Sequence, residues 1–247
     1  MTIVSPHLDD AVLSLGATIA RAVRDGSSVS VLTVFAGVEA STEPADDWAR
    51  RCGFATVGEA YRTRREEDRR AMVELGATAD HLPLDVGADD DEILGRLGPA
   101  LEDAEAILVP GSPCTQPEHA RIARLVLGHS QTARVGLYVD QPYAMWRLLG
   151  TPPLVGGGRV GNLLRLALRA PSAKRLQEPE LPAALSRTVP EVRWRRLPHS
   201  QRERWTKARA ISCYRSQLRG FGRATVPGIL LYESVAGGER VGWIEDG

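Results

Sequence analysis

Short apolar runs alternate with segments of helical periodicity over roughly the first 140 residues of the chain. Val12, Leu15, Ile19 and Val23 recur at three- to four-residue spacing and predict an amphipathic helix. The pattern as a whole predicts strands over residues 3–4, 28–35, 81–84, 106–109 and 135–139, and helices over residues 10–24, 60–75, 92–101 and 119–127. This alternation is typical of an α/β fold with a Rossmann-like, mostly parallel sheet flanked by helices.

The pattern changes after residue 150. Residues 151–198 contain many prolines and arginines and the run Gly156-Gly157-Gly158, which predicts an irregular insertion or lid. A long helix over 201–218 and a closing strand over 229–234 follow. We therefore expect one domain over 1–247, with its α/β core in 1–145, an insertion in 151–198 and a closing helix and strand in 201–235.

Charge and cysteine content exclude several classes of protein. The chain has 31 basic and 31 acidic residues, so it has no net field that attracts nucleic acid. No apolar run reaches the length that spans a bilayer. Cys52, Cys114 and Cys213 are odd in number and far apart, which argues against a disulfide framework. We expect a cytoplasmic protein that binds neither nucleic acid nor membrane; its oligomeric state stays open.

A cluster of metal-binding residue types lies where the first predicted strand meets the first helix. The segment Ser5-Pro6-His7-Leu8-Asp9-Asp10 holds one imidazole and two carboxylates, donors that suit zinc or ferrous iron. One aspartate here could simply cap the helix. A cap explains neither His7 nor the second carboxylate, so a metal site is the stronger hypothesis.

A second cluster follows the predicted strand over 106–109 and ends at His119. In an open parallel sheet the carboxyl ends of the strands line one crevice, so His119 and His7 could face each other. Two imidazoles and one carboxylate would leave a metal an open coordination position, which is the catalytic pattern.

These residues resemble the PIG-L/LmbE-like N-acetylglucosaminyl deacetylases. The stretch SPHLDDAVLSLG, residues 5–16, matches the P-H-x-D-D mark and the glycine-containing helix of that family. Similarity extends over about residues 1–143, including Arg64-x-x-Glu67 and the 140–143 segment, and a weaker match lies at 214–217. The resemblance implies that His7, Asp10 and His119 bind one zinc ion per chain, with Fe²⁺ as the alternative metal, and that Asp9 is the general base.

The later motif departs from the family pattern. Where the family commonly has H-P-D-H, this chain has Gln116-Pro117-Glu118-His119. The residue replaced by Gln116 is thought to stabilise the oxyanion, and a glutamine amide can donate a hydrogen bond but carries no positive charge. The family pattern also suggests that Arg64 contacts substrate, although pairing with Glu67 at i, i+3 explains it equally well.

The sequence thus favours a metal-dependent N-deacetylase that hydrolyses the acetamide, or a related acyl amide, of an N-acetylated amino sugar or its glycoside. The implied partner is a small, amino-sugar-like molecule. Two alternatives stay open. The same site could act on an acyl amide of a natural-product scaffold, or the chain could be a sugar- or nucleotide-binding module without catalysis, for which Gln116 is the only support.

Overall fold

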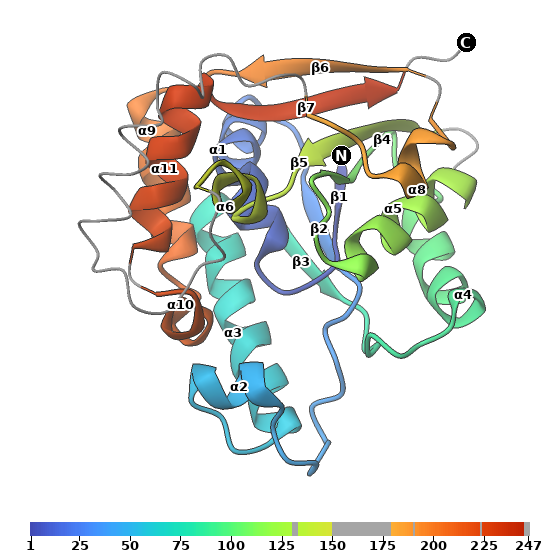
Figure 1. Ribbon diagram of the computed structural model, residues 1–247, viewed down its shortest axis with the longest axis vertical. Helices are drawn as coiled ribbons and strands as arrows, with labels where there is room; N and C mark the ends of the chain where they lie inside the picture. Colours follow the sequence, from blue (N-terminus) through green and yellow to red (C-terminus); the bar gives the residue numbers. More distant parts are fainter. Residues whose placement is uncertain (130–132, 150–178, 190, 223, 245–247) are drawn as a thin grey trace.

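The computed structural model describes residues 1–129, 133–149, 179–189, 191–222 and 224–244. Its centre is a seven-stranded sheet in the order β3-β2-β1-β4-β5-β7-β6 (Figure 1). The first five strands are parallel, and β7 and β6 extend the sheet in antiparallel fashion beyond β5. The strands are β1 (Thr2–Ser5), β2 (Ser30–Thr33), β3 (Thr78–His81), β4 (Ala106–Ser112), β5 (Arg134–Val139), β6 (Val192–Leu197) and β7 (Glu239–Ile244).

Helices cover both faces of this sheet. One apolar core lies beneath α1, α3, α9 and α11, and a second lies beneath α4, α5 and α8. The bounds are α1 (Asp10–Arg24), α2 (Asp47–Cys52), α3 (Val57–Leu75), α4 (Asp90–Leu101), α5 (Pro117–His129), α6 (Tyr143–Leu149), α8 (Ala183–Ser186), α9 (Gln201–Ile211), α10 (Arg215–Phe221) and α11 (Thr225–Ala236). The predicted Rossmann-like, mostly parallel sheet flanked by helices is confirmed.

Strand β1 shows why the sheet is apolar on both sides. Ile3 and Val4 are both fully buried, Ile3 in the core beneath α1 and Val4 in the core beneath α5. Successive side chains of a strand point to opposite faces, so a central parallel strand needs apolar residues at consecutive positions.

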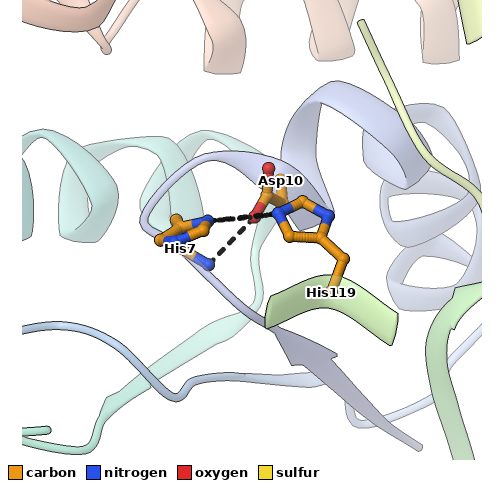
Figure 2. Close-up of side chains that lie close together, drawn as sticks. All are labelled: His7, Asp10 and His119. Carbon is orange, nitrogen blue, oxygen red and sulfur yellow. Dashed lines mark hydrogen bonds and ion pairs between the residues drawn. The ribbon is translucent and has the colours of Figure 1, made fainter. Parts of the chain in front are cut away.

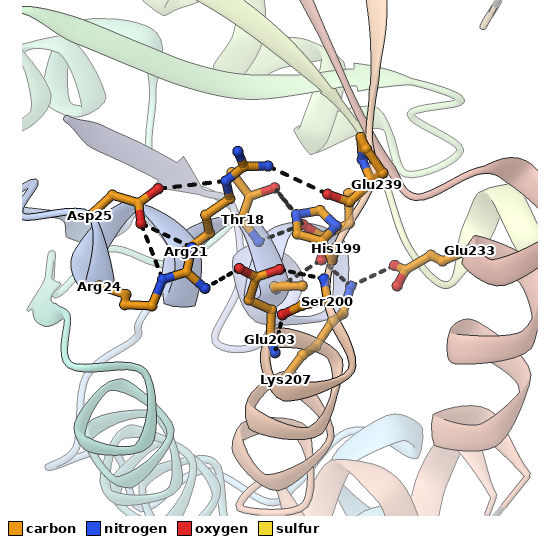
Figure 3. A network of polar contacts seen from close by, with 12 residues as sticks. Thr18, Arg21, Arg24, Asp25, His199, Ser200, Glu203, Lys207, Glu233 and Glu239 are labelled. Atoms are coloured by element: carbon orange, nitrogen blue, oxygen red, sulfur yellow. Dashed lines mark hydrogen bonds and ion pairs between the residues drawn. The ribbon is translucent and has the colours of Figure 1, made fainter.

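Helix α1 packs closely against α9 at one glycine. A Cβ atom on Gly16 would lie 2.8 Å from Cγ of Lys207, so only glycine leaves room for the lysine stem. The Lys207 ammonium is fully buried and donates to Glu233 at 2.5 Å and to Glu239 at 2.7 Å (Figure 3). The Glu239 carboxylate also accepts from the backbone N–H groups of Ala17 and Thr18. This charged cluster therefore ties α1, α9, α11 and β7 together.

The strand order creates a topological switch point between β1 and β4. The chain proceeds from β1 outward to β2 and β3, then returns to β4 on the other side of β1. In open α/β sheets the crevice outside the carboxyl ends of such a strand pair is where ligands bind. The two segments singled out in the sequence follow these two strands.

The C-terminal predictions need correction. Residues 229–234 belong to α11 and not to a strand; the closing strand is β7. A four-residue apolar run cannot by itself distinguish a strand from a buried helix, and this run lies inside a 12-residue helix that ends at the left-handed Gly237.

The prediction of one long helix over 201–218 is also wrong, because the helix is interrupted at residues 212–214, between α9 and α10. Near the break the Ser212 hydroxyl donates to the carbonyl of Ala208 at 2.7 Å, a contact that competes with regular helix continuation. Within the predicted irregular insertion, residues 151–178 lie outside the described part of the chain, while residues 192–197 form the regular strand β6. None of the described helices has the length and apolar character that a bilayer crossing requires.

Candidate metal centre

The turn between β1 and α1 is held by its own side chains. The Ser5 hydroxyl donates to the carbonyl of His7 at 2.7 Å and accepts from the backbone N–H of Ala11 at 3.1 Å. The backbone N–H of His7 donates to Oδ2 of Asp10 at 2.9 Å. Asp9 has a φ of 143°, a value that L-residues rarely adopt. These constraints direct the side chains of His7 and Asp10 to one point.

His119 reaches the same point from the first turn of α5 (Figure 2). Nδ1 of His7 lies 3.2 Å from Oδ2 of Asp10 and 3.2 Å from Nε2 of His119, and the last two atoms are 3.3 Å apart. Ligands about 2.0–2.1 Å from a tetrahedral zinc ion lie roughly 3.3–3.4 Å from one another. The three donor atoms therefore have the spacing that one such cation requires, and together they form a candidate metal-binding group.

Asp140 stands behind His119. Its Oδ2 lies 2.6 Å from Nδ1 of His119, and both side chains are fully buried. Burial lowers the pKa of His119, but Asp140 and Asp10 outweigh that effect and raise it to about 10. Two carboxylates thus favour positive charge at this point. A carboxylate on the far nitrogen also fixes the ring orientation of a metal-binding histidine, so the donor set fits a divalent cation.

Asp9 is the neighbour of Asp10 in the same turn and is not one of the three donors. The residue is 5% exposed, and its Oδ2 has no hydrogen-bond partner among the described residues. Burial, followed by the negative charge of Asp10, raises the pKa of Asp9 well above its usual range, whereas Arg64 lowers it. A buried carboxyl oxygen without a partner is costly, which is typical of a position that meets substrate or water.

The remaining predicted site residues lie around this centre. Gln116 is exposed at the start of α5 and interacts with the hydroxyl of Tyr143. Arg64 is half-buried on α3, its guanidinium lies 5.6 Å from the ring centre of Phe54, and its Nε and Nη2 have no hydrogen-bond partner among the described residues. Pairing with Glu67 does not explain Arg64, because the Glu67 carboxylate accepts from the backbone and hydroxyl of Ser216.

The sequence analysis assigned no role to three residues that shape the centre, although they lie in the family-like segments 140–143 and 214–217. Asp140 supports His119, Tyr143 packs edge-on against the His119 ring at 5.5 Å, and the Gln217 side chain donates to the carbonyl of Leu8 inside the metal-site turn. A signal existed for Asp140, which directly follows β5 at the same sheet edge as His7 and His119. Gln217 lies 209 residues from Leu8, and only the folded chain shows their contact.

The fold and this cluster define a class: α/β proteins with a candidate His-Asp-His metal site at the switch point of the sheet. The family model described as PIG-L, GlcNAc-PI de-N-acetylase, matches residues 2–129, more than half of the chain. The chain belongs to this family, and the predicted resemblance is confirmed.

Solved structures of similar fold cover the chain almost completely. The A40926 pseudoaglycone deacetylase Dbv21 is 23% identical, with a TM-score of 0.73 over 98% of this chain and 95% of its own. The zinc-inhibited form of the teicoplanin deacetylase Orf2 is 22% identical, with a TM-score of 0.71 over 98% and 96%. A deacetylase–teicoplanin complex is 21% identical, with a TM-score of 0.70 over 100% and 99%. Among the curated proteins, none matches this sequence.

Proposed function

We propose that this protein is a zinc-dependent N-deacetylase that hydrolyses the acetamide, or a related acyl amide, of an N-acetylated amino sugar or its glycoside. The observation that carries the proposal is the convergence of His7, Asp10 and His119 within 3.2–3.3 Å of one another, beside the unpartnered carboxyl of Asp9. Membership of a de-N-acetylase family supports the reaction type.

His7, Asp10 and His119 would hold the ion, and the same donors would also bind ferrous iron. When bound, zinc supplies Lewis acidity to the scissile carbonyl and makes a nearby water molecule more acidic. Asp140 keeps the His119 ring in place through its contact with Nδ1.

Asp9 is the proposed general base. It accepts a proton from the attacking water and passes that proton to the departing amine. Its raised pKa suits this role, because a carboxyl with a low pKa would hold the proton too weakly to deliver it. We assign to Gln116 the donation of a hydrogen bond to the developing oxyanion, and to Arg64 the binding of a substrate oxygen.

The substrate could be an amino sugar on a larger scaffold. The structural neighbours that cover nearly the whole chain are deacetylases of A40926 pseudoaglycone and of teicoplanin biosynthesis, which favours that alternative over a free monosaccharide. A turnover screen that compares N-acetylhexosamines with glycosides and acylated natural-product conjugates separates the two.

Metal analysis and histidine variants test the proposal. Purified protein should contain one divalent ion per chain and release acetate from an N-acetylated amino sugar. His7→Ala and His119→Ala should each lose the ion and reduce turnover at least 100-fold. His129→Ala is the matched control, since His129 is exposed at the other end of α5. A metal-free protein, or deacetylation unchanged in His7→Ala, would contradict the proposal; substrate binding with no turnover under saturating zinc would favour the non-catalytic alternative.

A further inference from the structure

A cavity lies beside the candidate metal centre, at the carboxyl ends of β4 and β5. Its volume is about 290 Å³, and its lining includes Ser112, Val139, Ala144, Leu148, Tyr232 and Arg240. Val139 directly precedes Asp140, and Ala144 directly follows Tyr143, so the cavity adjoins the metal centre across the end of β5 and the start of α6. None of the residues proposed for hydrolysis lines it.

Arg240 is the unusual residue of this cavity. Its side chain comes from β7 and the residue is 6% exposed, yet its Nε has no hydrogen-bond partner and no carboxylate forms an ion pair with it in the described part of the chain. Its Nη2 makes a long contact with the carbonyl of Ala236, at 3.4 Å. A buried guanidinium without a counter-ion is costly, and native proteins seldom keep one without a use.

The rest of the lining indicates what kind of anion would fit. Arg147 and Glu180 also line the cavity, but their charges offset each other through an ion pair at 2.6 Å, so Arg240 supplies the uncompensated charge. Tyr232 lies close enough for Arg240 to lower the pKa of its hydroxyl, which burial raises. Val139, Ala144 and Leu148 contribute apolar walls. A single negative charge with an apolar tail matches this surface better than a multiply charged anion does.

We propose that this cavity binds a monocarboxylate, whose carboxylate pairs with the Arg240 guanidinium and whose short carbon chain lies against the apolar walls. A planar guanidinium can hold a carboxylate through two parallel hydrogen bonds. The carboxylate belongs either to the substrate or to a free short-chain acid. The second source rests on the proposed function, because acetate or a longer carboxylate is the second product of acyl-amide hydrolysis.

Binding measurements on the metal-loaded protein test this site. Acetate, butyrate and hexanoate are titrated by calorimetry into wild type, Arg240→Gln, Arg240→Lys and Arg195→Gln, the last an exposed arginine on the neighbouring strand β6. We expect butyrate or hexanoate to bind more tightly than acetate, Arg240→Gln to weaken binding at least tenfold, Arg240→Lys to weaken it less, and Arg195→Gln to have no effect. Thermal unfolding should show that Arg240→Gln is folded and no longer stabilised by the acid.

Two further arms separate the sources and the hypotheses. Repeating the titration on the His119→Ala variant asks whether the acid binds without the metal ligand set, and we expect that it does. If the substrate supplies the carboxylate, Arg240→Gln should raise the KM for an acidic substrate at least tenfold. The KM for a neutral substrate should stay unchanged. Unaltered acid binding in Arg240→Gln, equal binding of chloride or phosphate, or loss of acid binding in His119→Ala would overturn the proposal. A lack of deacetylase activity alone would contradict the proposed function but not this carboxylate site.

Discussion

Gln116 is the residue at which this chain departs from the pattern of its family. The side chain is exposed at the start of α5 and interacts with Tyr143. If its amide stabilises the oxyanion, Gln116→Ala should lower kcat about 10- to 100-fold and leave zinc content unchanged. Steady-state kinetics beside metal analysis checks this.

Two companion variants sharpen that experiment. Gln116→His introduces the residue common in the family and should raise kcat above that of Gln116→Ala. Tyr143→Phe removes the hydroxyl that Gln116 contacts, so its kcat shows whether Gln116 acts by positioning Tyr143. An unchanged kcat in Gln116→Ala would assign oxyanion stabilisation to another group.

Asp140 acts through His119. Because its Oδ2 lies 2.6 Å from Nδ1 of that histidine, Asp140→Asn should weaken zinc affinity about 10- to 100-fold while the protein stays folded. Competition with a chelator of known affinity measures the change, and Asp103→Asn, in an exposed turn, is the control. Equal affinities in the two variants would leave Asp140 without the positioning role described above.

For individual residues, the sequence predicted the metal-binding side chains that lie in recognisable motifs. It did not predict contacts that depend on which strands are neighbours. His7 and Asp10 are three residues apart, and His119 follows a recognisable buried strand. The contact of Asp140 with His119 exists because β5 lies next to β4, an adjacency that periodicity does not reveal. The roles assigned to Asp9, Gln116 and Arg64 stay predictions.

Among the elements, α1 depends on a glycine. A Cβ atom on Gly16 would approach Cγ of Lys207 to 2.8 Å and its Cβ to 3.3 Å, so Gly16→Ala should lower the free energy of unfolding by about 1–3 kcal/mol. Gly95→Ala in α4 is the control, because nothing lies within 4 Å of its added methyl. That variant should gain about 0.5–1 kcal/mol from helix propensity. Urea denaturation measures both, and a stabilised Gly16→Ala would show that α9 can move aside.

Most element predictions succeeded where strands and helices alternate, although the strand predicted over residues 81–84 shares only His81 with β3. They failed where the alternation stops. Residues 106–109 are apolar and bounded by turn residues, so their strand was plain in the sequence. The run at 229–232 has the same character but lies within a helix. Residues 239–244 include two charged residues and one glycine, and they showed no strand pattern before β5 and β6 were known to flank them. Strand pairing decided the second case, and the surrounding 12-residue helix decided the first.

Across the whole molecule, the buried cluster of Figure 3 gives the stability a pH dependence. Burial raises the pKa of Glu233 from its usual 4.5 to about 8; Lys207 and Arg204 lower it and Glu239 raises it. The folded protein therefore holds this proton more tightly than the unfolded chain does. The resulting stabilisation is complete below about pH 4.5 and is lost as the pH rises to 8.

The Glu233→Gln variant isolates this effect. Relative to the variant, wild type should lose free energy of unfolding between pH 5 and 8, by at most about 1.4 kcal/mol per pH unit. Urea denaturation of both proteins across that range measures the difference. Parallel curves would mean that Glu233 stays ionised beside Lys207 at all these pH values.

The parallel pairing of β1 with β4 determines whether the donor atoms of the candidate metal centre come together. Only Thr2 and Ile3 pair with Ile107 and Leu108, and the histidines that follow the two strands must meet within 3.2 Å. A slip of one residue would displace His7 by about 3.3 Å, as far as the two nitrogens are now apart. The correct register of β1 against β4 is therefore required for the proposed metal site to form. A chain with shifted register would fail to bind metal.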